Sequence, residues 1–332
     1  MENKNQVSIK SLILLWAFAE TSIGGVLHAL KLPFTGILVG GIAVISIALI
    51  GFYQKPGTNE ILRALIIVLM AKLLVSPHSP WQAYIAVAFQ GYIGSLIYRS
   101  NSNFKVKTMM FATLALFESA IQKLLVALII FGNDFFSSLD IAANSVVGSM
   151  GWNPEFSFVY TVFGTYIFLH LLTGIILGFW IPRIPDDVAG FRMPELDFDP
   201  VTSETKMKKY KKRIWITTGV FIAILLTLKW LIPDTPSMVL VYMFVRALLI
   251  SLILVFVVGP LIKNWVKRWI QRKNIDATSW NDIIDMLPRF SLKAFAVLKY
   301  VQQQFSGLAR IRYFLLGIIV VSAKEVNDTW QK

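Results

Sequence analysis

Long apolar runs recur along this chain, and they constrain its fold more than any other feature. A helix needs roughly 20 mostly apolar residues to cross the hydrocarbon core of a bilayer. Eight runs are predicted to be membrane-spanning helices: Ser11–Leu30, Phe34–Tyr53, Glu60–Ser76, Trp81–Tyr98, Lys107–Phe131, Phe156–Ile181, Ile214–Ile232 and Ser237–Ile262. Only 15% of the residues are charged, whereas soluble domains have about 25%. The sequence therefore predicts an all-α, polytopic membrane bundle.

The distribution of charge predicts the orientation of these spans. Cytoplasmic loops of membrane proteins carry an excess of Lys and Arg. With a cytoplasmic N-terminus, the inner connections contain Lys55, Arg63, Arg99, Lys105, Lys107, Arg183, Arg192 and the cluster Lys206–Arg213. The outer connections contain one base, Lys31, and four acids: Asp134, Asp140, Glu155 and Asp234. We therefore expect a multi-pass protein of the inner (cytoplasmic) membrane with both termini in the cytoplasm. In a membrane protein the positions of the charges matter more than their sum, here +13, so membrane lipids are expected as partners and nucleic acid is not.

A proline-rich and charged stretch, Pro182–Arg213, divides the chain. We expect a six-helix membrane domain at 1–182, a cytoplasmic linker at 183–213, a two-helix membrane segment at 214–262 and amphipathic helices on the cytoplasmic side or in the interface at 263–332. A single eight-helix bundle with one long loop is the alternative. In the outer connection, Phe135–Val147 is weakly amphipathic and predicts a short surface helix.

The C-terminal region has the pattern of amphipathic helices. Trp265 and Trp269 lie four residues apart among several bases, which is typical of a helix lying flat in the membrane interface. After Pro288, apolar residues continue a helical stripe: Phe295, Leu298, Val301 and Phe305. We expect a helix at Pro288–Arg312 that a protein partner covers, and a buried or interfacial helix at Tyr313–Ala323.

Several polar residues fall inside the predicted spans. A charged side chain at bilayer depth costs about 2.5–3.5 kcal/mol on insertion scales, so each needs a reason. The residues predicted to bind a small solute are Glu20, His28, Lys72, Gln90, Glu118 and His170. They fall in the middle and outer half of the first six spans. The alternative is that Glu20–Lys72 or Glu118–Lys123 are buried ion pairs that set the helix register. On the sixth span, Gly174 and Gly178 predict close approach of a neighbouring helix.

Catalytic motifs are absent from the sequence. It contains no cysteine, no His-Glu-x-x-His motif and no P-loop, so no metal or cofactor is expected, and an enzyme is disfavoured. The leading hypothesis is a transporter component that binds a small solute. Its rivals are a structural or interaction subunit of an envelope complex and an intramembrane lipid-modifying enzyme that uses Glu20, Glu118 and His170.

The segment Ala19–Gly36, followed by Gly40-Gly41, resembles the start of the substrate-binding S components of energy-coupling-factor (ECF) vitamin transporters. This resemblance implies six membrane helices and small residues on the first helix that contact a partner, here Ala17, Thr21, Gly24 and Gly25. The tail segment Leu308–Arg312 resembles the T component of the same systems. This second resemblance implies that Arg310 and Arg312 bind a cytoplasmic ATPase.

Overall fold

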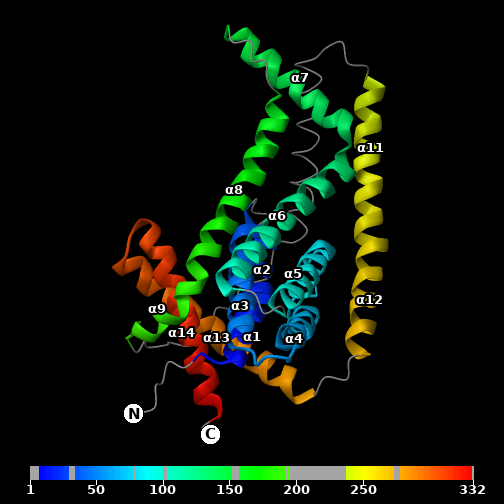
Figure 1. Cartoon of the computed structure of the whole chain (residues 1–332). Coiled ribbons are helices and arrows are strands. Elements are labelled where there is room, and N and C mark those ends of the chain that lie inside the picture. Colours follow the sequence, from blue (N-terminus) through cyan, green and yellow to red (C-terminus); the bar gives the residue numbers. More distant parts are fainter. Residues whose placement is uncertain are drawn as a thin grey trace. The chain divides into compact units, whose positions relative to one another are not determined.

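The computed structural model of the chain describes residues 7–29, 34–77, 79–99, 103–151, 157–191, 193–194, 237–272 and 277–330 (Figure 1). Every regular element among these residues is a helix, and they contain no strand. This confirms the all-α prediction. The chain divides into two compact units. Unit 1 comprises Met1–Ala120, Leu169–Pro200 and Val258–Lys332, and unit 2 comprises Ile121–Phe168 and Val201–Val257.

Unit 1 contains most of the helices. Its elements are α1 (Ile9–Phe18), the π-helical segment η1 (Ala19–Ile23), α2 (Gly24–Ala29), α3 (Thr35–Tyr53), α4 (Glu60–Val75), α5 (Trp81–Arg99), most of α6 (Phe104–Phe131), the second half of α8 (Phe158–Trp180), η2 (Ile181–Arg183), α9 (Ile184–Gly190), α12 (Gly259–Gln271), α13 (Ala277–Gln304) and α14 (Gly307–Trp330). Unit 2 holds the rest of α6 and α8, together with α7 (Asn133–Ser149), α11 (Ser237–Ile253) and η3 (Leu254–Val258).

Helix α1 lies in the core of unit 1. Ser8 caps its start, because the Ser8 hydroxyl accepts a hydrogen bond from the Ser11 N–H at 3.2 Å and the Ser11 hydroxyl accepts one from the Ser8 N–H at 3.1 Å. The side chains from Ser11 to Phe18 are all buried. A helix that is apolar all round is stable only when it is covered on every side. Helices α3, α4, α13 and α14 supply that cover (Figure 1).

Four helices of the described residues are long and apolar enough to cross a membrane: Thr35–Tyr53, Phe104–Phe131, Phe158–Gly190 and Val241–Gln271. The structure thus supports a membrane protein but does not show eight spans. The first predicted span is divided by η1, and α4 has only 16 residues. The seventh predicted span, Ile214–Ile232, lies outside the described residues, as does most of the linker at which the domains were expected to divide. The eight-span topology and that domain division stay predictions.

The close helix approach predicted at Gly174 and Gly178 is confirmed. A Cβ atom on Gly174 would lie 2.8 Å from the Cα of Thr113, and one on Gly178 would lie 2.8 Å from the Cα of Met109. Contacts this short leave no room for a side chain, so α8 packs against the backbone of α6 only because both positions are glycine.

The predicted course of the tail is wrong in two respects. Pro288 lies inside α13, which begins at Ala277, and the helix ends at Gln304 and does not reach Arg312. Its buried face includes Phe290, Ala294, Val297 and Val301, whereas Phe295 of the predicted stripe is 63% exposed. The reason is packing within the chain. Helix α13 rests on α1, α4 and α14, and the Phe290 ring meets Phe18 edge to face at 4.9 Å.

The predicted helix boundary at Ile262 is also wrong. Helical residues continue without interruption from Ser237 through η3 to Gln271. Gly259, Val266 and Ile270 are buried in α12, and Trp265 is 63% exposed. The buried face of α12 contacts α4 and α5, so packing against this chain, and not only a membrane surface, satisfies its apolar side. Whether its remaining surface lies on the inner leaflet stays a prediction.

Unit 2 contains the helix that was predicted at Phe135–Val147, because α7 covers the whole stretch, and its place on the outer surface stays a prediction. Phe135 and Ala142 pack with Met243 of α11 in a small apolar core. Asp140 of α7 accepts a hydrogen bond from the Val159 N–H at 3.0 Å and so holds the start of α8. This bond occupies one of the N–H groups that the first turn of a helix leaves unpaired.

Candidate functional site

A buried ion pair joins the first helix to α4. The Nζ of Lys72 lies 2.7 Å from Oε2 of Glu20 and also donates a hydrogen bond to the Glu20 carbonyl oxygen at 3.1 Å. The Lys72 side chain is 0% exposed and that of Glu20 is 6% exposed. The two charges are therefore neutralised within the helix bundle. This is the contact that the ion-pair alternative predicted.

Glu20 belongs to the π-helical segment η1. Such segments are rare and occur frequently at functional sites, because the extra residue disturbs the regular backbone ladder. Here the disturbed turn presents both a carboxylate and a carbonyl oxygen to one lysine. Gly24 and Gly25 follow at once, and a Cβ atom on Gly25 would lie 3.2 Å from the Ser76 Oγ. The end of α4 therefore lies close to α2.

Polar contacts also hold the connection between α4 and α5. The Tyr84 hydroxyl lies 3.4 Å from the Ser76 carbonyl oxygen, and the Tyr84 ring centroid lies 5.9 Å from the Lys72 Nζ. On α12, Lys263 donates a hydrogen bond to the Pro77 carbonyl oxygen, and its Nζ lies 5.6 Å from the same ring centroid. Tyr84 thus lies near two lysines. Neither Tyr84 nor Lys263 was predicted to belong to this environment.

A second polar group surrounds the start of α3. Gly36 and Gly40 lie one helical turn apart on α3. A Cβ atom on Gly36 would collide with the Ser119 Oγ and lie 3.4 Å from the His170 Nε2, and one on Gly40 would lie 3.4 Å from the Gln90 Nε2. Side chains of α5, α6 and α8 therefore approach the α3 backbone. We call Gln90, Ser119 and His170 the α3 polar group.

Two acceptor atoms near this region lack hydrogen bonds. Gln90 is 3% exposed, and neither its Oε1 nor the Oε2 of the partly buried Glu118 has a hydrogen-bond partner among the described residues. A buried polar atom left unsatisfied costs roughly 1–3 kcal/mol, so such atoms in native proteins need an explanation. Both atoms accept hydrogen bonds, so they suit a ligand with N–H or O–H groups.

The predicted binding residues therefore divide among different places. The ion pair joins Glu20 and Lys72 between η1 and α4, while His170 approaches α3 at Gly36 and Gln90 approaches it at Gly40. His28 belongs to α2, and its side chain lies outside the description. Ser119 was not predicted to be a site residue. The one indication in the sequence was its position next to Glu118 in a predicted span. No group of three or more histidine, cysteine or carboxylate side chains in the described part of the chain could hold a metal ion.

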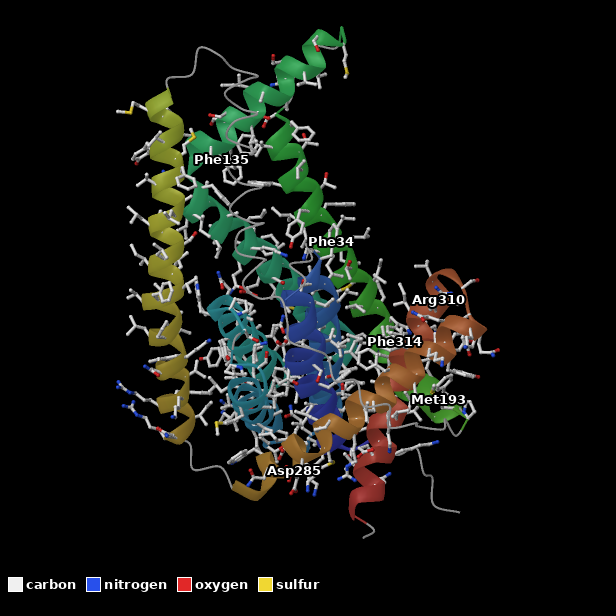
Figure 2. All side chains as sticks on the ribbon, turned by 180° about the vertical axis from the view of Figure 1, so that it is seen from behind. Phe34, Phe135, Met193, Asp285, Arg310 and Phe314 are labelled. Atoms are coloured by element: carbon white, nitrogen blue, oxygen red, sulfur yellow. The ribbon has the colours of Figure 1, made fainter. Side chains whose placement is uncertain are left out.

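The two arginines predicted to bind a partner have bonds within the chain. Arg310 lies in the first turn of α14, close to the end of α13 (Figure 2). It donates from Nε to the Phe305 carbonyl oxygen and from Nη2 to the Gln302 carbonyl oxygen, both at 3.1 Å. It therefore caps the end of α13. Arg312 lies 3.1 Å from an oxygen of Asp187 in α9. Binding of a partner at these arginines stays a prediction.

Another buried carboxylate lies in the tail. Glu325 of α14 is 2% exposed and pairs with Lys293 of α13. This pair resembles Glu20–Lys72 in its chemistry but joins two neighbouring tail helices. It therefore offers a matched control for the role of Glu20.

No protein-family model, curated protein or solved structure matches the chain.

Proposed function

We propose that this chain is a component of an inner-membrane transporter and binds a small polar solute among its first helices. The observation that carries the proposal is the α3 polar group, in which Gln90, Ser119 and His170 approach the backbone of α3 at Gly36 and Gly40. The solute would donate hydrogen bonds to the unpaired oxygens of Gln90 and Glu118.

The position of this group along α3 supports a site that opens outward. In the predicted orientation the second span begins on the outer side of the membrane. Gly36 and Gly40 lie in the first two turns of α3, which places them in the outer half of the bilayer in that orientation. Because polar side chains inside membrane spans commonly mark solute or ion pathways, the arrangement favours transport over a purely structural role.

The resemblance of Ala19–Gly36 to the S components of ECF transporters supports the same function. It would make a cytoplasmic ATPase the source of energy, because the sequence has no P-loop of its own. The rival hypothesis, a structural subunit of an envelope complex, predicts that the polar residues serve folding alone. The transporter hypothesis predicts that solute binding is lost when one polar atom is removed and the fold is kept. The structural hypothesis predicts no effect of such a change beyond its effect on folding.

The test is to purify the protein in lipid nanodiscs and identify co-purifying small molecules by mass spectrometry. We expect a compound to accompany the unaltered chain, to be lost from Gln90→Leu and to be reduced in Glu118→Gln. The matched control is Ser46→Ala on α3, because Ser46 is buried but bonds only to the Ile42 carbonyl oxygen of its own helix, at 2.9 Å. The comparison uses variants that melt at the same temperature as this control.

Retention of the same compound by Gln90→Leu, or purification of the unaltered chain without any compound, would contradict the proposal. A compound lost equally from Ser46→Ala and Gln90→Leu would also contradict it, since the loss would then follow from general damage to α3.

A further inference from the structure

A basic cavity lies at the opposite end of α3 from the α3 polar group. Its volume is about 690 Å³, and it is bounded by the end of α3, the start of α4, the end of α5 and the start of α6. Gly51 in its wall follows Gly40 by 11 residues, so at about 1.5 Å per residue the two positions are about 16 Å apart along the helix. The cavity is therefore distinct from the proposed solute site.

Among the described residues that line this cavity, every charged side chain is basic. Lys55, Arg99 and Lys107 line it, and its described lining residues include no acid. The other polar side chains of the wall are uncharged, among them Gln54 and Asn59. Three bases around one cavity whose described lining contains no acid produce a positive potential that attracts anions.

The two connections that supply these bases are held by specific contacts. In the α3–α4 connection, the Lys55 carbonyl oxygen accepts hydrogen bonds from the Thr58 N–H at 3.1 Å and from the Thr58 hydroxyl at 2.8 Å. Gly57 in this turn has φ 84°, a conformation that favours glycine. The turn therefore has a defined shape that places Lys55 at the cavity.

Tyr98 fixes the other wall. It is 5% exposed, and its hydroxyl donates a hydrogen bond to the Thr108 Oγ1 at 3.0 Å, which ties the end of α5 to the start of α6. The Lys107 Nζ lies 5.8 Å from the centroid of its ring. Gln54 adds an acceptor, because its buried Oε1 has no hydrogen-bond partner in the part of the chain that is described.

We propose that this cavity binds a phosphate group that bears at least one O–H or N–H donor nearby. Arg99 would provide a planar, bidentate contact to phosphate oxygens, and the two lysines would add point charges. Gln54 would accept from the donor. In the predicted orientation both connections are cytoplasmic, where anionic lipid headgroups meet basic pockets between membrane helices. A headgroup and a soluble phosphate compound share this chemistry.

The test compares ligand binding by the whole chain and its variants in detergent. The probes are phosphatidylglycerol, phosphatidylcholine and inorganic pyrophosphate, with affinity measured from thermal stabilisation. The variant is the triple change Lys55→Gln, Arg99→Gln and Lys107→Gln. The control is Lys10→Gln, Arg183→Gln and Lys299→Gln, which removes three positive charges at exposed positions that do not line the cavity.

We expect each removed cavity base to weaken binding about tenfold, because its removal eliminates one charge-assisted hydrogen bond. The control variant should bind like the unaltered chain. Binding of phosphatidylglycerol alone would identify a lipid headgroup, and binding of pyrophosphate would identify a soluble phosphate compound. Equal weakening in both triple variants, or no binding of either anionic probe by the unaltered chain, would overturn the proposal.

Amine labelling provides a second measurement if the cavity variant does not fold. In the unaltered chain, the bound probe should slow acetylation of Lys55 and Lys107 and leave the rate at the exposed Lys299 unchanged. Equal rates at all three lysines with and without probe would count against the cavity. This outcome is independent of the solute site, which contains none of these residues.

Discussion

The Nζ of Lys72 donates hydrogen bonds to both the carboxylate and the carbonyl oxygen of Glu20, 52 residues earlier in the chain. One lysine thus satisfies the charge of Glu20 and also a carbonyl oxygen of the π-helical segment. The pair ties η1 to α4 and so positions the start of the chain against the helices that follow.

Removal of one partner of this pair should be strongly destabilising. We expect Lys72→Met or Glu20→Gln to lower the free energy of unfolding by roughly 3–5 kcal/mol, because the remaining buried group loses its partner. The double variant Glu20→Leu with Lys72→Met should recover most of this loss. Thermal unfolding in detergent measures each effect, and Glu325→Gln in the tail is the control for loss of a buried carboxylate.

The same double variant separates the two roles of the pair. If the ion pair only sets the helix register, the stable double variant should keep the co-purifying solute. Loss of the solute from a double variant that unfolds at the normal temperature would instead make Glu20 or Lys72 part of the binding site.

Substitution of Gly174 should disrupt the contact between α6 and α8. A Cβ atom there would lie 2.8 Å from the Cα of Thr113 and 2.9 Å from the Ala112 carbonyl oxygen. Both are backbone atoms, so Gly174→Ala should cost about 1–3 kcal/mol in unfolding experiments. Gly164→Ala on α8 is the control, because a Cβ atom there meets no other atom within 4 Å. Equal melting temperatures for the two variants would show that the helices separate easily.

The arginines of the tail can be tested for partner binding separately from their bonds within the chain. The exposed pair Arg312–Asp187 contributes at most about 1 kcal/mol, so Asp187→Asn should leave the fold intact while both arginines remain. Arg310→Glu with Arg312→Glu should release a bound cytoplasmic partner in a pull-down, and Asp187→Asn should retain it. Release by both variants would mean that partner binding depends on how the tail is placed and not on the arginine side chains themselves.

Low pH should loosen the start of α8. Hydrogen bonds from Ser157 and from the backbone N–H groups of Val159 and Phe158 lower the pKa of Asp140 below its usual value. The stabilisation is therefore complete above the ordinary aspartate pKa of about 3.9 and is lost as the pH falls through the lowered value. Exchange-rate measurements at the Val159 amide should show increasing opening in this acid range, after correction for intrinsic exchange. Asp140→Asn should remove that pH dependence, and an unchanged profile would exclude Asp140 as its cause.

The predicted orientation has a direct test. Reporter fusions within Asn133–Glu155 should report the outer side, and fusions within Pro182–Arg213 should report the cytoplasm, because basic residues concentrate in the second stretch. The reverse result at either place would contradict the proposed outer position of the solute site and the inner position of the basic cavity.

Much of the architecture could be predicted because it depends on local composition. Apolar runs of span length predict helices wherever they occur, and the structure has helices at every predicted span that falls within its described residues. The spacing of Gly174 and Gly178 likewise predicted close packing, since two glycines four residues apart remove side chains from one strip of a helix. The basic character of the loops was also evident from the sequence. The sequence did not indicate that Lys55, Arg99 and Lys107 line one cavity.

The tertiary structure decided which faces meet. Helix α13 has two adjacent rows of apolar side chains, and helical periodicity alone does not indicate which row other helices bury. The buried row, which includes Phe290 and Val297, was therefore not predicted. Helix α1 is apolar all round and therefore has no face that indicates its neighbours, which is why its cover by α13 and α14 was not foreseen. Sequence alone thus determined the helices and the residue types that need partners. Only packing between distant segments decided that Glu20 pairs with Lys72 and that His170 approaches Gly36.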